Sequence, residues 1–377
     1  MSVARLSEVA QGRDNNFNLI RILAALAVLV GHSFPIALGK GAGDPVAGLV
    51  GISLGGIAVD VFFVTSGFLV TGSLLSRDRL LDFFWARALR IFPALTVMVM
   101  LSVFGLGLYF TTLPTTAYLS DPKSLNYLVK NIILFRDVVW DLPGVFESNP
   151  FKSAVNGSLW TLPKEVKLYT LLGVIWFLVG VIAKNRTSTF GSTVIGFTIL
   201  GAAVVGYNVF LPGPNVVNWH LFFMFFIGSA FYTLRGRVVL SRGMFWLVVM
   251  VLAFSAIHRQ AFLFVYVLTL GYVVLYVAYV PTGYVRLFNR AGDYSYGVYI
   301  YAFPVQQSVA ALVPGISIWG MIAIASAVTL VLAVLSWHWI ERPALDLRGW
   351  GVNLIRRLQA EIFSFFRAVR ARFPRRS

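Results

Sequence analysis

Two ionisable residues, Arg21 and His32, lie inside one apolar stretch that runs from Asn16 to Pro35. They are eleven residues apart. At about 100° per residue, this spacing puts both side chains on the same helix face, on the order of 16 Å apart along the axis. Both groups are unfavourable in lipid, so the pattern predicts a functional site with a cation at one end and a titratable imidazole at the other. The alternative is that Arg21 reaches the headgroups while His32 hydrogen-bonds inside a bundle.

A carboxylate follows in the next apolar stretch. Asp60 lies within residues 55–70 and needs a buried partner, either His32 or an arginine. An Asp60–His32 pair would orient the imidazole and make it a better base. The small residues of this stretch, including Ser66 and Gly67, are typical of helices that approach each other closely.

Two further arginines, Arg87 and Arg90, are three residues apart and therefore stacked on one helix face. Two guanidiniums in this arrangement suit a phosphate or pyrophosphate group. The alternative is ordinary positive charge at the cytoplasmic end of a span. We expect both arginines at the cytoplasmic mouth of the third span.

Other polar residues stand at the ends of apolar stretches. Glu165 follows Pro163 at the expected outer boundary, where it either caps a helix or binds an acceptor hydroxyl. Glu341 ends the last apolar stretch, where an ion pair with a basic loop is expected. Tyr294 opens a tyrosine-rich segment that an interfacial aromatic belt would explain. The remaining histidines, His220, His258 and His338, lie near predicted membrane boundaries without metal-ligand spacing, so no metal site is predicted.

The composition indicates a membrane protein. The chain has 377 residues, of which 58% are hydrophobic and 12% charged, and its mean hydropathy is +0.79. Soluble domains carry about twice that charged fraction. There is no cysteine, which excludes disulfides, thiolate metal sites and a cysteine acyl-enzyme. The net charge of +16 reflects where the basic residues lie and is not interpreted as nucleic-acid binding.

We expect an all-α polytopic protein with about ten transmembrane helices. The apolar segments lie near residues 17–37, 52–75, 88–110, 165–183, 191–211, 217–234, 243–258, 260–280, 294–314 and 318–340. If ten helices cross, most lysines and arginines fall on one side, which puts both termini in the cytoplasm.

The rest of the chain divides around this bundle. Residues 1–15 form a cytoplasmic tail, 16–343 the transmembrane domain, and 344–377 a basic tail, whose segment from 347 onward has the pattern of an amphipathic helix on anionic lipid. Residues 111–160 form one long outside loop, which is commonly a lid or binding surface. Within it, 125–135 has the pattern of a short interfacial helix.

The ordered set of motifs resembles the membrane acyltransferase-3 family, integral-membrane proteins that O-acylate bacterial surface and secreted carbohydrates. The resemblance covers about residues 15–345. It rests on Arg21 with His32, V-D-V-F-F-V-T-S-G-F (59–68), R-A-L-R-I-F-P (87–93), S-L-W-T-L-P-K-E (158–165), D-Y-S-Y-G-V-Y-I-Y (293–301) and I-E-R-P (340–343).

The resemblance implies an O-acyltransferase of the bacterial inner membrane that takes an acyl group, with acetyl as the simplest choice, from cytoplasmic acyl-CoA. No permanently bound cofactor is expected, and the partners would be acyl-CoA, a polysaccharide or lipid-linked glycan acceptor, membrane lipids and polysaccharide biosynthesis or export proteins. His32 would be the general base, with Asp60 or Glu165 as helper, and a covalent acyl relay would need serine, tyrosine or His32 itself. Arg21, Arg87, Arg90 and Tyr294 are assigned to acyl-CoA, and Ser66, Gly67, Trp160 and Glu341 to supporting roles.

Two positions depart from the family pattern. Asn18 stands where many relatives have aspartate, so a carboxylate partner for Arg21 is not assured, and Ala302 replaces a common histidine. The chief competing hypothesis is a transporter or flippase in which Arg21, His32 and Asp60 line the route. A sensor or assembly factor of an export complex, which would bind no CoA, is a third hypothesis.

Overall fold

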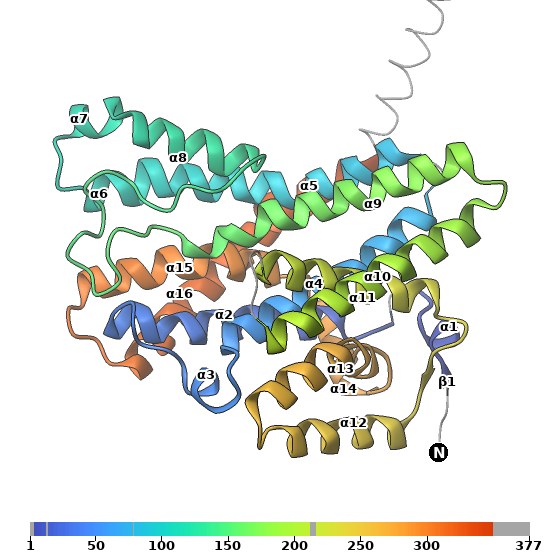
Figure 1. Ribbon diagram of the computed structural model, residues 1–377. Helices are drawn as coiled ribbons and strands as arrows, with labels where there is room; N and C mark the ends of the chain where they lie inside the picture. The colour runs from blue at the N-terminus through green and yellow to red at the C-terminus, as the bar shows by residue number, and fades with distance from the viewer. Residues whose placement is uncertain (1–3, 13, 78, 212–215, 350–377) are drawn as a thin grey trace, which may run out of the picture.

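The computed structural model describes residues 4–12, 14–77, 79–211 and 216–349, and most of these are helical. The long helices are α2 (Phe17–Leu38), α4 (Leu54–Leu75), α5 (Leu80–Met100), α9 (Leu162–Ile182), α10 (Arg186–Phe210), α11 (Val216–Thr233), α12 (Arg242–Ser255), α13 (Arg259–Tyr279), α15 (Ser295–Leu312) and α16 (Ile318–Ser336). An α-helix therefore occupies each of the ten predicted segments (Figure 1).

The shorter elements connect or extend these helices. They are β1 (Ala4–Arg5), α1 (Leu6–Val9), α3 (Pro45–Val50), the π-helix η1 (Leu101–Gly107), α6 (Leu108–Phe110), α7 (Thr115–Ser120), α8 (Pro122–Ile133), the 3-10 helix η2 (Gly157–Thr161), β2 (Val239–Leu240), α14 (Tyr284–Leu287), the 3-10 helix η3 (Phe288–Arg290), the π-helix η4 (Trp337–Glu341) and α17 (Arg342–Asp346). The two strands pair antiparallel, with Ala4 opposite Leu240.

Among the described residues, eight helical segments are long and apolar enough to cross a membrane. The two predicted spans outside this group are α12, which has only 14 residues, and α15. Tyrosines and glutamines lower the hydropathy of α15, although most of its side chains are buried by neighbouring helices. The count of ten crossings and the cytoplasmic termini therefore stay predictions, and the predicted amphipathic tail lies mostly outside the described residues.

Two predicted helix starts were wrong. The third helix begins at Leu80 rather than near residue 88, so Arg87 and Arg90 lie inside it and not at its mouth. The fourth begins at Leu162, after the turn η2, rather than at Glu165. In both cases the charged residues were placed at a helix end because they are unfavourable in lipid, whereas here other helices cover them.

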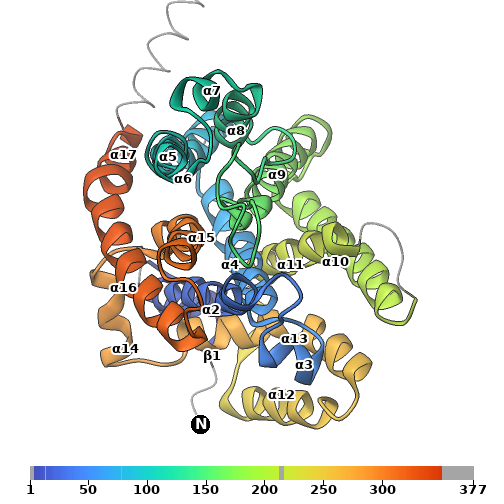
Figure 2. The ribbon, with the colours of Figure 1, turned by 90° about the vertical axis from the view of Figure 1, so that its left-hand side faces the viewer.

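The segment predicted as a long loop is ordered by its own hydrogen bonds. The predicted short helix is confirmed as α8, which begins after Asp121, whose carboxylate accepts a hydrogen bond from the backbone of Lys123. The side-chain amide of Asn131 holds both the N–H and the C=O of Val139. The segment packs α8 against α5, on the side of the bundle away from α12 (Figures 1 and 2).

Helix α4 lies at the centre of the bundle, with α2, α9, α11 and α15 around it (Figure 2). Its closest neighbour is α11, and small residues make that approach possible. A Cβ on Gly67 would lie 1.9 Å from the carbonyl oxygen of Phe225, and one on Gly228 would lie 2.1 Å from that of Val64. The hydroxyl of Ser229 donates to the carbonyl oxygen of Gly67 at 3.2 Å. The packing role predicted for Gly67 therefore agrees with its position.

We predict that Gly67→Ala lowers the stability of the folded protein, because the new methyl group forces α4 and α11 apart. Overpacking of a well-packed interior costs about 1–3 kcal/mol. The unfolding temperature of the detergent-solubilised protein, monitored by gel filtration after heating, measures the effect. Gly196→Ala is the matched control, since a Cβ there meets no atom within 4 Å. Equal unfolding temperatures for the two variants would contradict this packing role.

Candidate active site

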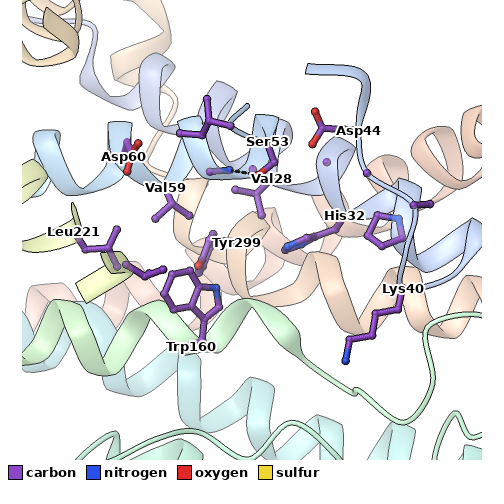
Figure 3. A pocket seen from close by; sticks show the side chains of 18 of the residues that line it. Val28, His32, Lys40, Asp44, Ser53, Val59, Asp60, Trp160, Leu221 and Tyr299 are labelled. Carbon is purple, nitrogen blue, oxygen red and sulfur yellow. Dashed lines mark hydrogen bonds between the residues drawn. The ribbon is translucent and has the colours of Figure 1, made fainter. Parts of the chain in front are cut away.

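A cavity of about 530 Å³ lies among the C-terminal half of α2 and the N-terminal parts of α4 and α11. The polar and aromatic groups on its walls include His32, Lys40, Asp60, Trp160, His220 and Tyr299. Figure 3 shows His32, Trp160 and Tyr299 directed into the space between α2, α4 and α9, with Lys40 on the connection that follows α2. The cavity thus combines two imidazoles with aromatic walls.

Helix α2 places His32 in this cavity and Arg21 in a second, smaller pocket. Arg21 lies near the N-terminal end of α2, and His32 lies about three turns further along. The two pockets are lined in common by Val59 and Tyr299, so they adjoin each other. The predicted shared face of Arg21 and His32 is consistent with this arrangement.

The imidazole of His32 has no carboxylate partner among the described residues. Its Nδ1 is buried there without a hydrogen bond, and its ring meets the ring of Phe303 edge-on at a centroid distance of 5.2 Å. The predicted Asp60–His32 pair was therefore wrong.

Asp60 pairs with His220 instead. Nε2 of His220 lies 2.8 Å from each carboxylate oxygen of Asp60, and the hydroxyl of Tyr266 donates to Oδ2 at 2.8 Å. The reason is the helix face. Asp60 and Gly67 are seven residues apart, so both lie on the side of α4 that meets α11.

The smaller pocket contains Glu165 together with Arg21. The hydroxyl of Ser66 donates to Oε1 of Glu165 at 2.8 Å, and the hydroxyl of Tyr169 donates to the same oxygen. Ser66 is in the middle of α4, so Glu165 lies deep in the bundle. Glu165 lies in the first turn of α9, and both of these partners are side-chain hydroxyls rather than backbone groups of its own helix. Its nearest partners belong to a buried hydrogen-bond cluster.

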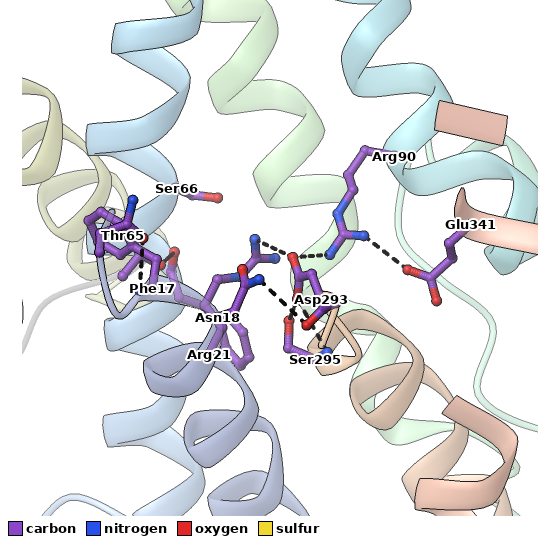
Figure 4. A network of polar contacts seen from close by, with 12 residues as sticks. Phe17, Asn18, Arg21, Thr65, Ser66, Arg90, Asp293, Ser295 and Glu341 are labelled. Atoms are coloured by element: carbon purple, nitrogen blue, oxygen red, sulfur yellow. Dashed lines mark hydrogen bonds and ion pairs between the residues drawn. The ribbon is translucent and has the colours of Figure 1, made fainter. Parts of the chain in front are cut away.

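Two arginines and two carboxylates form a chain of ion pairs beside this pocket (Figure 4). Arg21 contacts Asp293 at 3.1 Å, Arg90 contacts Asp293 at 2.6 Å, and Arg90 contacts Glu341 at 2.9 Å. Burial alone would raise the pKa of the Asp293 carboxyl, but the guanidiniums of Arg21 and Arg90 outweigh it and lower that pKa to about 2. Asp293 is therefore held in its charged form between the two guanidiniums.

This network changes two expectations. The carboxylate partner of Arg21, left open because of Asn18, is Asp293. Asn18 instead donates to the backbone oxygen of Gly292 at 3.4 Å. Glu341 pairs with Arg90 inside the bundle and not with a basic loop, because helix α5 begins earlier than expected and buries Arg90 among its neighbours.

Arg87 differs from Arg90 despite their spacing. Nε of Arg87 is buried and has no hydrogen-bond partner among the described residues, whereas both terminal nitrogens of Arg90 are engaged by carboxylates. Of the two stacked guanidiniums, Arg87 is thus the one with unused hydrogen-bonding capacity.

The hydroxyl of Tyr294, which was assigned to acyl-CoA, donates to the backbone oxygen of Ala291 at 2.6 Å. Its ring packs edge-on against Trp337.

The sequence interpretation missed His220, Tyr266 and Asp293 as members of these clusters. His220 was assigned to a membrane boundary, although it is one of only four histidines and falls inside an apolar segment. Asp293 is one of only 15 acidic residues and directly precedes the tyrosine-rich segment. The scarcity of such groups in an apolar chain was the available signal.

Comparison with known proteins agrees with the motif resemblance. Residues 14–338 match the family described as an acyltransferase domain. An O-acetyl transferase of Shigella phage Sf6 is 29% identical over 352 residues, which cover 88% of this chain and 96% of that protein. Nodulation protein 10 of Rhizobium leguminosarum bv. viciae is 29% identical over 378 residues, covering 91% of this chain and 96% of that protein.

A third relative, from Bacillus subtilis strain 168, bears a provisional name as a peptidoglycan O-acetyltransferase. It is 28% identical over 332 residues, which are 77% of this chain and 50% of the relative. No solved structure matches the chain. Because the family match covers nearly the whole sequence, the chain belongs to the membrane acyltransferase-3 family.

Proposed function

We propose that the protein moves an acyl group, acetyl in the simplest case, from cytoplasmic acyl-CoA to a hydroxyl of a cell-surface or exported glycan. Family membership supports acyl transfer, and the names of two relatives refer to O-acetyl transfer. The multi-pass bundle would lie in the bacterial inner membrane, with membrane lipids and polysaccharide biosynthesis or export proteins as neighbours.

The observation that supports this proposal most is the pair of adjoining pockets on either side of Tyr299. One contains Arg21 and Glu165, and the other contains His32. A donor that approaches from the Arg21 side would bring its thioester toward His32, while an acceptor would arrive from the Lys40 side. Transfer would then take place where the two pockets meet.

The simplest chemical step uses His32 as general base. Its imidazole takes the proton from the acceptor hydroxyl, the hydroxyl oxygen bonds to the thioester carbonyl carbon, and the carbon–sulfur bond breaks. The leaving CoA thiolate then receives the proton from His32. General bases in such roles contribute about 10²- to 10⁴-fold to rate.

The donor phosphates would be held by the arginines of this end of the bundle. Arg21 and Arg90 already have carboxylate partners, so we assign the principal phosphate contact to Arg87, whose Nε has no partner among the described residues. Asp293 and Glu341 would keep the other two guanidiniums in place when no donor is bound.

We predict that Arg87→Ala weakens acetyl-CoA binding by about tenfold or more, since a charge-assisted contact to phosphate contributes about 1.5–3 kcal/mol. Isothermal titration of the purified protein with acetyl-CoA measures this. Arg259→Ala is the matched control, because Arg259 lies at the start of α13 and hydrogen-bonds the backbone of Gly51. If Arg87→Ala and Arg259→Ala bind acetyl-CoA equally well, the phosphate role is wrong.

The same titration tests the proposed function. Binding of acetyl-CoA, followed by release of CoA when glycan is added, is the expected result. If native protein binds neither acetyl-CoA nor a longer acyl-CoA, the acyl-CoA donor is refuted, and the transporter hypothesis gains weight.

A further inference from the structure

His220 is the second imidazole of the main cavity. It projects from the second turn of α11 and lines the same cavity as His32. Its side chain is 23% exposed, whereas that of its partner Asp60 is 2% exposed. One edge of the ring therefore contacts a buried carboxylate while part of the ring remains accessible.

The two ring nitrogens of His220 have different surroundings. Nε2 lies 2.8 Å from both oxygens of Asp60, so this nitrogen makes the contact with the carboxyl group. Nδ1 has no hydrogen-bond partner among the described residues. Tyr266 donates to Asp60 from α13, so the orientation of the imidazole is fixed by groups on α4 and α13. Carboxylates orient histidine rings in this way at many functional sites.

The position of His220 separates it from the donor side. Arg21 and Glu165 line the smaller pocket, and His220 does not. His220 shares the larger cavity with Lys40 and Trp160, and this cavity reaches the C-terminal half of α2, whereas Arg21 lies near the N-terminal end of that helix. A group bound at His220 would thus lie in the same cavity as His32 and outside the pocket of Arg21 and Glu165.

We propose that His220 positions the acceptor, with Nδ1 hydrogen-bonded to a sugar hydroxyl next to the one that is acylated. This inference rests on the proposed transfer to a glycan. A hydroxyl both donates and accepts hydrogen bonds, so it is a suitable partner for the nitrogen that Asp60 leaves unused. Trp160 and Tyr299 supply aromatic surface on the same walls for the apolar face of a sugar ring. The Asp60–His220–Tyr266 cluster thereby acquires a role in acceptor recognition that is separate from the base at His32.

Two conservative variants distinguish the ring nitrogens. In His220→Gln, the amide reaches the position of Nε2 and keeps the bond to Asp60 but offers nothing at Nδ1. In His220→Asn, the shorter amide places a polar atom near Nδ1 and gives up the bond to Asp60. His258→Gln is the matched control, because His258 is exposed at the start of α13 and does not line the cavity.

The assay uses purified full-length protein in lipid nanodiscs, radiolabelled acetyl-CoA and the glycan fraction extracted from source cells that lack the chain. It measures the acetyl-CoA Kd, the apparent KM for glycan and kcat. We expect His220→Gln to raise the glycan KM by about tenfold, equivalent to one lost hydrogen bond to substrate, with the acetyl-CoA Kd within about twofold of native. His220→Asn should recover part of the native KM, and His258→Gln should equal native.

Each other outcome overturns the proposal. If the glycan KM of His220→Gln stays at the native value, His220 does not contact the acceptor. A parallel loss of acetyl-CoA binding and transfer in both His220 variants assigns His220 to the framework of the bundle instead. If native protein binds acetyl-CoA but labels no glycan, the acceptor class in the proposed function fails, and this inference fails with it. If native protein transfers normally and only the His220 result is negative, the proposed function stands alone.

Discussion

His32→Ala is expected to abolish acyl transfer while the protein remains folded and still binds acetyl-CoA. The loss should reach about 10²- to 10⁴-fold, the usual contribution of a general base. The fold should survive because Nδ1 of His32 makes no hydrogen bond among the described residues, and the ring contributes mainly an edge contact with Phe303. Release of CoA from acetyl-CoA in the presence of glycan, together with acetyl-CoA titration, separates the chemical step from donor binding.

The matched control for His32→Ala is the same substitution at another histidine of the protein. His258→Ala should transfer at the native rate, since that residue is exposed between α12 and α13. If His32→Ala transfers the acyl group at more than about a tenth of the native rate, His32 is not the general base. A loss of acetyl-CoA binding in His32→Ala would instead place His32 in the donor site.

Relations within one helix could be predicted from the sequence, because helical geometry fixes them. The shared face of Arg21 and His32 follows from their spacing alone. The existence of long helices followed from apolar length, and a helix occupies each predicted segment. The close approach of α4 to another helix followed from small residues such as Gly67.

Pairings between helices could not be predicted in the same way. Asp60 and His220 are 160 residues apart in sequence, and Arg90 and Glu341 are 251 apart. Helical periodicity shows which side of α4 carries Asp60, but it does not show which neighbouring helix packs against that side. Asp60 was paired with His32 because that imidazole is on the adjacent segment, whereas the tight packing of α4 on α11 turns the carboxylate toward His220.

The starts of the third and fourth helices failed for a related reason. Charged residues were placed at the ends of these two spans, since isolated charges are unfavourable in lipid. In the folded chain, Arg90 and Glu165 have partners contributed by other helices. A single sequence shows which residues are charged, but the partner groups that offset the cost of burying those charges are brought together only by the tertiary structure.

Those compensating partners make Arg90 the residue whose loss should affect folding most. Arg90→Ala would remove the guanidinium that lies between the carboxylates of Asp293 and Glu341. Glu341 would then have lost its arginine partner although its side chain is only 3% exposed. Removing one partner of a buried ion pair costs on the order of 3–5 kcal/mol. We therefore expect Arg90→Ala to lower the unfolding temperature and the yield of monodisperse protein.

The stability of Arg90→Ala can be separated from any role of Arg90 in donor binding. Arg87→Ala is the matched control, since it removes a guanidinium three residues away whose Nε has no hydrogen-bond partner among the described residues. The double variant Arg90→Met with Glu341→Gln should recover part of the lost stability, because it removes an opposite charge together with the arginine. Thermal unfolding in detergent without any acyl-CoA measures all three. If Arg90→Ala unfolds at the same temperature as Arg87→Ala, the ion-pair chain does not stabilise the fold, and Arg90 would then be free to serve as a phosphate contact alongside Arg87.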